Sequence, residues 1–172
     1  MKKEIQYRYS NESFFDDDTD ILITEPINAG EYELKLYLRA LGIFVEDVSN
    51  NKDYWKKDID LLIHNDDESV VSIEVKWDSR IADTGNLFIE TITNEDTWQE
   101  GWFAYCKADF LFYGDSENKV FYVISLDDLR AVVNAKNYKT GRAKDWNGKP
   151  SIGLLVPLTD IKDVSFMFKL KE

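Results

Sequence analysis

The residues Val70-Val71-Ser72-Ile73-Glu74-Val75-Lys76-Trp77 form an apolar run that contains one acid and one base. The β-branched residues predict a strand, in which residues two apart point to the same face of the sheet. Glu74 and Lys76 therefore share one face, and Ile73 and Val75 share the other. Charges are costly to bury unless they are paired or bound to a metal. The run is therefore either an edge strand, where charges discourage aggregation, or part of a site.

The charged tripeptide is not distinctive by itself. An acid followed two residues later by Lys occurs four times, at 33–35, 74–76, 117–119 and 160–162. The sequence predicts a helix around the first, a turn around the third, and a terminal loop or short helix around the fourth. Only residues 74–76 lie inside a predicted strand, so the surrounding sequence distinguishes this copy from the others.

A second acid, Asp60, lies in the apolar segment 59–63. This segment predicts a strand, which a turn at 64–67 joins to the strand at 70–77 as a hairpin. Asp is depleted in strands, so its presence among Ile and Leu calls for a reason. Hairpin pairing can bring Asp60 beside Glu74, close enough to share a divalent cation. Asp58 shares the face of Asp60 and is the alternative, but Asp60 lies deeper in the apolar run.

A third acid, Glu31, lies at the start of a predicted helix over residues 31–41, which Gly42 ends. From this helix Glu31 can approach Asp60 and Glu74 from above the sheet. A capping box with Asn28 explains the same residue equally well. Three carboxylates beside a lysine suit Mg²⁺ or Mn²⁺, which prefer oxygen ligands. At such a site Lys76 would orient the attacking water or neutralise the transition state.

These residues resemble the PD-(D/E)xK nuclease superfamily, which has the restriction-endonuclease-like fold. The matching residues are Glu31, Asp60 and the pair Glu74 and Lys76, in the superfamily's order, and the resemblance covers about residues 28–125. The proline of the motif is absent, since Ile59 precedes Asp60. The resemblance implies an α/β fold with a mixed central sheet flanked by helices. It also implies metal-dependent hydrolysis of DNA phosphodiesters, with the three acids binding Mg²⁺ or Mn²⁺ and Lys76 activating water.

The remaining pattern predicts helices at 95–108 and 126–133, with strands at 43–45, 110–113, 120–124 and 153–158 and a weak one at 21–23. A length of 172 residues, 44% of them hydrophobic, favours a single domain over residues 1–172. The sequence has no membrane-spanning stretch and no signal-peptide core, and Cys106 is its only cysteine. We therefore expect a soluble cytoplasmic protein from a reducing compartment.

The net charge of −12 argues against broad affinity for nucleic acid. One stretch, residues 134–150, is locally basic. It supplies candidate DNA contacts, although a basic surface loop without function explains it equally well. Those contacts are Lys136, Lys139, Arg142, Lys144 and Lys149.

Two functions of different classes follow from these features. The first is a metal-dependent deoxyribonuclease of phage, mobile-element, repair or restriction biology. The second is a non-catalytic acidic binding protein on the same fold, either an inactive relative or a nucleic-acid mimic. A single His and a single Cys nearly exclude a zinc site or a His-dependent triad. The small size is compatible with a homodimer.

Overall fold

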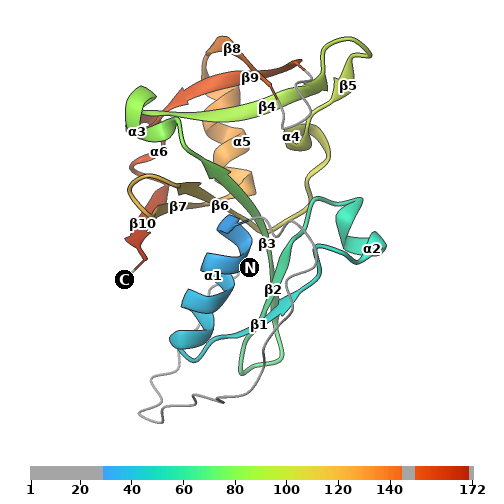
Figure 1. Cartoon of the computed structure of the whole chain (residues 1–172), viewed down its shortest axis with the longest axis vertical. Helices are drawn as coiled ribbons and strands as arrows, with labels where there is room; N and C mark the ends of the chain where they lie inside the picture. The colour runs from blue at the N-terminus through green and yellow to red at the C-terminus, as the bar shows by residue number, and fades with distance from the viewer. Residues whose placement is uncertain (1–28, 145–149, 171–172) are drawn as a thin grey trace.

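The chain folds around two β-sheets, which lie one above the other in Figure 1. The computed structural model describes residues 29–144 and 150–170. The predicted strand at 21–23 therefore lies outside the described residues. The first sheet has the order β1-β2-β3-β6-β7-β10. Its strands are β1 (Phe44–Asp47), β2 (Leu61–His64), β3 (Val70–Asp78), β6 (Phe110–Asp115), β7 (Val120–Ser125) and β10 (Ser165–Lys169).

The second sheet is smaller and has the order β5-β4-β9-β8. Its strands are β4 (Asn86–Asn94), β5 (Gln99–Glu100), β8 (Lys139–Lys144) and β9 (Pro150–Pro157). The helices are α1 (Ala29–Ala40), α2 (Lys52–Trp55), α3 (Ile81–Thr84), α4 (Trp102–Tyr105), α5 (Leu126–Ala135) and α6 (Leu158–Ile161). None of the helices in the described residues is long and apolar enough to cross a membrane.

The first sheet is mixed, as the sequence predicts. β2 and β3 form the expected antiparallel hairpin, in which Leu61 lies opposite Ile73. β3 then pairs in parallel with β6, while the other neighbours in the sheet are antiparallel. The parallel pair requires a long connection, which the chain uses to build α3, β4, β5 and α4. An α/β fold with a mixed central sheet flanked by helices is therefore confirmed.

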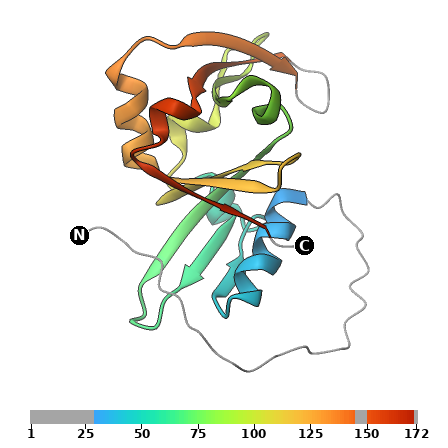
Figure 2. The ribbon, with the colours of Figure 1, turned by 90° about the vertical axis from the view of Figure 1, so that its left-hand side faces the viewer.

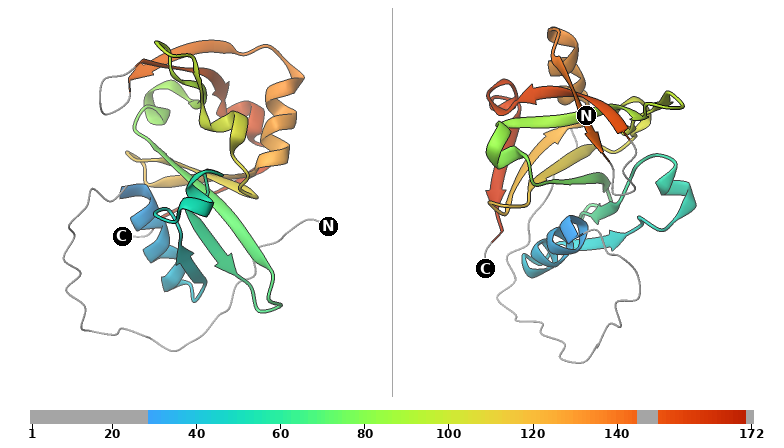
Figure 3. Two further views of the ribbon diagram at one scale, coloured as in Figure 1. Left: turned by 90° about the vertical axis from the view of Figure 1, so that its right-hand side faces the viewer. Right: turned by 45° about the horizontal axis from the view of Figure 1, so that its top comes forward.

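Helices cover both faces of the first sheet, as Figure 2 shows. On one face, Leu34 and Leu38 of α1 pack with Ile73 and Val75. On the other face, a second core joins the first sheet to α5 and to the smaller sheet (Figure 3). Glu74 and Lys76 alternate with Ile73 and Val75, so they point away from α1 and toward this second layer.

The two longer helices form where the sequence predicts them, and their local signals explain their ends. In α1, Leu34 and Leu38 are one turn apart and buried, and Gly42 after the helix has a φ of +77°. In α5, the Ser125 hydroxyl accepts a hydrogen bond from the Asp128 N–H at 3.1 Å and caps the first turn. These helices confirm the predictions at 31–41 and 126–133 within two residues at each end.

The predicted helix at 95–108 is wrong. Only Trp102–Tyr105 is helical, and the chain before it forms β4, a turn and β5. Gly101 shows why a continuous helix fails, because a β-carbon there would lie 2.5 Å from the Glu90 carbonyl oxygen. Upstream, Leu87 and Ile89 are fully buried and alternate with half-buried Phe88 and Glu90. This alternation is the strand signal of β4, which lies before residues 95–108 and which the sequence interpretation did not use.

Candidate active site

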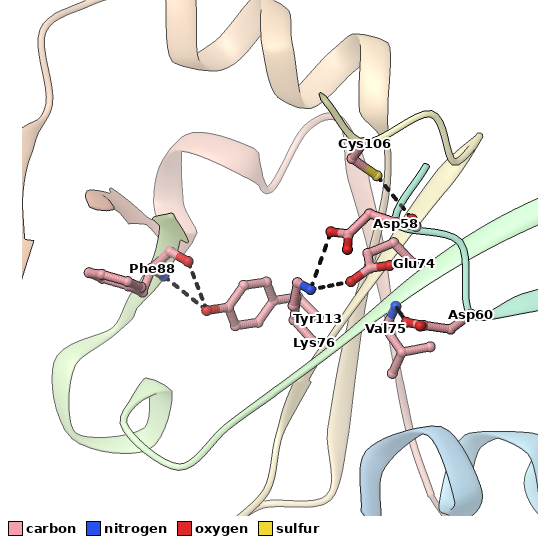
Figure 4. A network of polar contacts seen from close by, with 8 residues as sticks. All are labelled: Asp58, Asp60, Glu74, Val75, Lys76, Phe88, Cys106 and Tyr113. Carbon is pink, nitrogen blue, oxygen red and sulfur yellow. Dashed lines mark hydrogen bonds and ion pairs between the residues drawn. The ribbon is translucent and has the colours of Figure 1, made fainter. Parts of the chain in front are cut away.

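Strand β3 holds the central pair of the site. Glu74 and Lys76 form an ion pair through Glu74 Oε1 and Lys76 Nζ. The Glu74 side chain is 2% exposed, whereas the Lys76 side chain is 28% exposed. The acid is therefore enclosed by the protein, and the amine connects it to the surface. Figure 4 shows the ion pair between Glu74 and Lys76.

Asp58 reaches the same lysine from the segment before β2. Its carboxylate Oδ2 lies 3.5 Å from Lys76 Nζ. The backbone of Asp58 has a φ of +52°, a conformation in which Asp is tolerated better than most residues. The Cys106 thiol donates a hydrogen bond of 3.3 Å to the Asp58 carbonyl and holds this turn against α4. The sequence interpretation kept Asp58 only as an alternative to Asp60, but both belong to the cluster.

Asp60 continues the hairpin by one residue beyond β2. Its N–H donates to the Ile73 carbonyl at 2.9 Å, and its carboxylate accepts the Val75 N–H at 2.8 Å. The side chain thus takes the place of a backbone acceptor at the end of the ladder. The Asp60 carboxyl group lies near the Glu74 carboxyl group, because Asp60 continues the register that places Leu61 opposite Ile73. The structure therefore brings Asp60, Glu74 and Lys76 together.

The cluster holds more negative than positive charge. Asp58, Asp60 and Glu74 supply three carboxylates, and Lys76 supplies one ammonium, which leaves a surplus of two negative charges at full ionisation. Burial raises the pKa of Glu74 well above its ordinary value, although Lys76 opposes this. Burial likewise raises the pKa of Asp60, against the hydrogen bond from Val75. The protein therefore disfavours the full set of charges unless a further cation is present.

The lysine is held in its charged form. Burial lowers the pKa of Lys76, but the carboxylates of Glu74, Asp58 and Asp60 outweigh this effect and raise it above the ordinary value. Lys76 therefore acts as a fixed positive charge and hydrogen-bond donor.

One aromatic ring completes the surroundings of the amine. Lys76 Nζ lies 5.2 Å from the centroid of the Trp102 ring, which is 5% exposed. Trp102 falls inside the helix predicted at 95–108. It begins α4 directly after Gly101, whose extended backbone packs against β4, and no local pattern in the sequence signals its position against Lys76. A similar pair occurs elsewhere in the chain, where Lys119 Nζ lies 5.2 Å from the Trp77 ring and bonds to Glu33.

Glu31 is placed differently from the other predicted acids. It lies in the first turn of α1, whose buried residues pack on the sheet face of Ile73 and Val75. Glu74 and Lys76 occupy the opposite face. A role for Glu31 in the same site therefore stays a prediction.

Glu74 and Asp60 fit part of the ligand set of a metal ion whose remaining ligands come from water and substrate. Across residues 29–144 and 150–170, no group of three His, Cys, Asp or Glu side chains is arranged to hold a metal by itself. However, Glu74 Oε2 is buried and has no hydrogen-bond partner. Mg²⁺ commonly binds to one or two carboxylates and completes its shell with waters and substrate phosphates. Glu74, through this free oxygen, and Asp60 match that smaller donor set.

The site opens into a pocket of about 630 Å³, which Lys76 and Trp102 line together with residues of the second sheet. Tyr113 on β6 helps to join the two sheets at the side of this pocket. Its hydroxyl accepts the Phe88 N–H at 3.1 Å and lies 3.2 Å from an Asp78 carboxylate oxygen. Burial raises the pKa of Tyr113, so the hydroxyl remains protonated.

The predicted DNA contacts divide into separate groups. Lys139, Arg142 and Lys144 lie on β8, which is a paired strand where a loop was expected. Arg142 and Lys144 line the pocket. Lys136 follows α5 and forms an ion pair with Asp160. Lys149 lies outside the described residues.

No protein-family model, curated protein or solved structure matches this chain. The geometry and charge of the site are therefore the basis for inferring its function.

Proposed function

We propose that the protein is a metal-dependent nuclease that hydrolyses DNA phosphodiester bonds, with the restriction-endonuclease-like fold. The observation that carries the proposal is the unpartnered, buried oxygen Glu74 Oε2 in a cluster that has two surplus negative charges when fully ionised. A divalent cation supplies both the missing ligand contact and the missing charge. The order α1, β1, α2, β2, β3 is compatible with the superfamily resemblance over residues 28–125.

Each residue has a defined part in the proposed reaction. Asp60 and Glu74 hold Mg²⁺ or Mn²⁺, with Glu31 as a further predicted ligand. The bound ion supplies a water of lowered pKa and positive charge beside the scissile phosphate. Lys76 donates hydrogen bonds to the attacking water or to the phosphate oxygens, and its fixed charge stabilises the negative charge of the transition state. Asp58, together with Glu74, keeps the Lys76 amine in position.

The test is cleavage of plasmid and oligonucleotide DNA with Mg²⁺ or Mn²⁺, comparing wild type with Glu74→Gln, Lys76→Met and Asp60→Asn. The Asn variant is chosen because its side-chain oxygen can still accept the Val75 N–H. We expect each variant to lose at least about 100-fold in rate, since a positioned acid or base contributes about 10²–10⁴-fold.

Two control variants separate chemistry from folding. Asp109→Asn changes another Asp that accepts a backbone N–H of β3, at Ser72. Lys119→Met removes a lysine that also pairs with a Glu and lies over a Trp ring. Both should keep wild-type activity within about threefold, because they lie outside the cluster. Folded protein without activity on any DNA, or with activity unchanged by the three site variants, would refute the nuclease and favour the acidic binding protein.

A further inference from the structure

The pocket beside Lys76 is lined by basic, polar and aromatic side chains, most of which have no part in the proposed hydrolysis. One wall is the end of β3, and the facing wall is the second sheet. Along β4, the half-buried residues Asn86, Phe88 and Glu90 line the pocket, while Leu87 and Ile89 between them are in the core. The second sheet thus turns its polar and aromatic face toward the site.

The pocket is positive within a negative protein. Its lining carries four basic and two acidic side chains, a surplus of two positive charges, against −12 for the whole chain. These side chains are Lys76, Arg80, Arg142, Lys144, Asp78 and Glu90. Arg80, Arg142 and Lys144 are exposed, and two hydrogen bonds from Arg142 Nε and Nη2 to Glu95, of 3.1 and 2.7 Å, hold its guanidinium at this edge. Because Lys76 is paired with Glu74 and Asp58, the exposed cations Arg80, Arg142 and Lys144 at the edge of the pocket are the groups that attract a phosphate backbone toward the site.

The size of the pocket limits what can enter. A volume of about 630 Å³ falls in the range, about 300–1,000 Å³, of pockets that enclose one small ligand. One or two nucleotides of a single strand are ligands of that size. A duplex brings two paired strands and keeps its bases stacked inside. Phe88, half-buried in the lining, offers an aromatic surface for an unstacked base.

We infer that the substrate enters this pocket as a single strand, such as a frayed end, a flap or a gap, with its phosphates on Arg80, Arg142 and Lys144. A base stacks on Phe88, and the backbone then passes Lys76. This inference rests on the proposed nuclease function and names its substrate class. A positive groove with an aromatic platform is the usual combination in proteins that bind single strands.

The test measures binding in the absence of metal, so that it does not depend on cleavage. Fluorescence anisotropy with EDTA compares a labelled 12-nucleotide single strand with the blunt duplex of the same sequence. We expect the single strand to bind at least tenfold more tightly. Arg80→Ala with Lys144→Ala should weaken its binding at least tenfold and reduce the slope against log salt by about 1.4, since each phosphate contact contributes about 0.7 on single strands.

Matched variants check the two parts of the inference. Lys52→Ala with Lys56→Ala removes two exposed lysines at α2, outside the pocket, and should change affinity less than twofold. Phe88→Leu keeps an apolar side chain over Gly153 but removes the ring, and should weaken binding about fivefold or more. Phe88→Tyr keeps the ring and should bind like wild type.

The possible outcomes separate the two proposals. A duplex that binds as tightly as the single strand, or a failure of both to bind, overturns the single-strand inference whether or not DNA is cleaved. An unchanged affinity in the Arg80 and Lys144 double variant also overturns it. Tight single-strand binding without cleavage in Mg²⁺ or Mn²⁺ would instead refute the nuclease and retain the pocket as a single-strand binding site.

Discussion

The surplus negative charge around Lys76 predicts that the two partners of the ion pair contribute unequally to stability. Lys76→Met removes the only cation of the cluster and leaves Asp58, Asp60 and Glu74 facing one another in a largely buried space. Removing one partner of a buried pair typically costs about 3–5 kcal/mol. Because the Lys76 side chain is 28% exposed, we expect the lower end, about 3 kcal/mol.

Glu74→Gln should behave differently. It removes one of the three competing carboxylates and leaves Lys76 paired with Asp58. The amide keeps the shape of the side chain and can donate a hydrogen bond toward Asp60. The lost attraction to Lys76 and the relieved repulsion oppose each other, so we expect the metal-free stability to stay within about 1 kcal/mol of wild type.

The assay is urea unfolding followed by tryptophan fluorescence, with and without Mg²⁺. An ion that binds only the folded state stabilises it by about 2.7 kcal/mol at 100 times its dissociation constant. Wild type should show such a gain, and Glu74→Gln should lose it. Lys119→Met is the matched control, because its pair with Glu33 is partly exposed and should contribute under about 1 kcal/mol. If Glu74→Gln lowers the free energy of unfolding as much as Lys76→Met does, the two partners contribute equally to stability and the prediction from surplus charge is refuted.

Three further predictions concern the rest of the fold. Gly114→Ala should destabilise the protein by about 3 kcal/mol in urea unfolding, because a β-carbon there would lie 2.0 Å from the Trp77 ring; a loss below about 1 kcal/mol would contradict this contact. Burial raises the pKa of Asp47, but hydrogen bonding to Lys35 outweighs this effect and holds the pKa below the ordinary value. The ion pair of Asp47 therefore stabilises the folded state above about pH 4, and this stabilisation is lost as the pH falls through the lower folded pKa. Asp47→Asn should therefore cost under about 1 kcal/mol at pH 7 and nothing near pH 2, and an equal cost at both pH values would contradict the assignment. Burial raises the pKa of Cys106 to about 12, so iodoacetamide at pH 8 should modify it only in urea, as mass spectrometry would show; rapid modification of the native protein would argue against its burial.

The local part of the candidate site could be predicted from the sequence. Alternation along β3 places Glu74 and Lys76 on one face with Ile73 and Val75 on the other, and the structure confirms it. The hairpin also brings Asp60 beside Glu74, as expected. Both results involve residues of a single hairpin, in which strand periodicity and the position of the turn set the register.

The second sheet could not be predicted in the same way. β8 carries Lys139, Arg142 and Lys144 and has no apolar alternation, so it is a strand only because it pairs with β9. The predicted helix at 95–108 failed at Gly101, whose close approach to the Glu90 backbone is visible only in three dimensions. Propensity is a weak signal in such segments, because tertiary contacts outweigh it.

Local sequence patterns are enough to place a carboxylate and an ammonium side by side on a stiff strand, with an Asp across the hairpin. Their surroundings depend on contacts between distant segments: Asp58 beside the amine, Trp102 against it, and a pocket with basic side chains formed with a second sheet. The difference lies in the range of the interactions. Side-chain direction repeats every two residues along a strand, whereas the parallel pairing of β3 with β6 and the closure of the pocket arise from many weak contacts between distant segments.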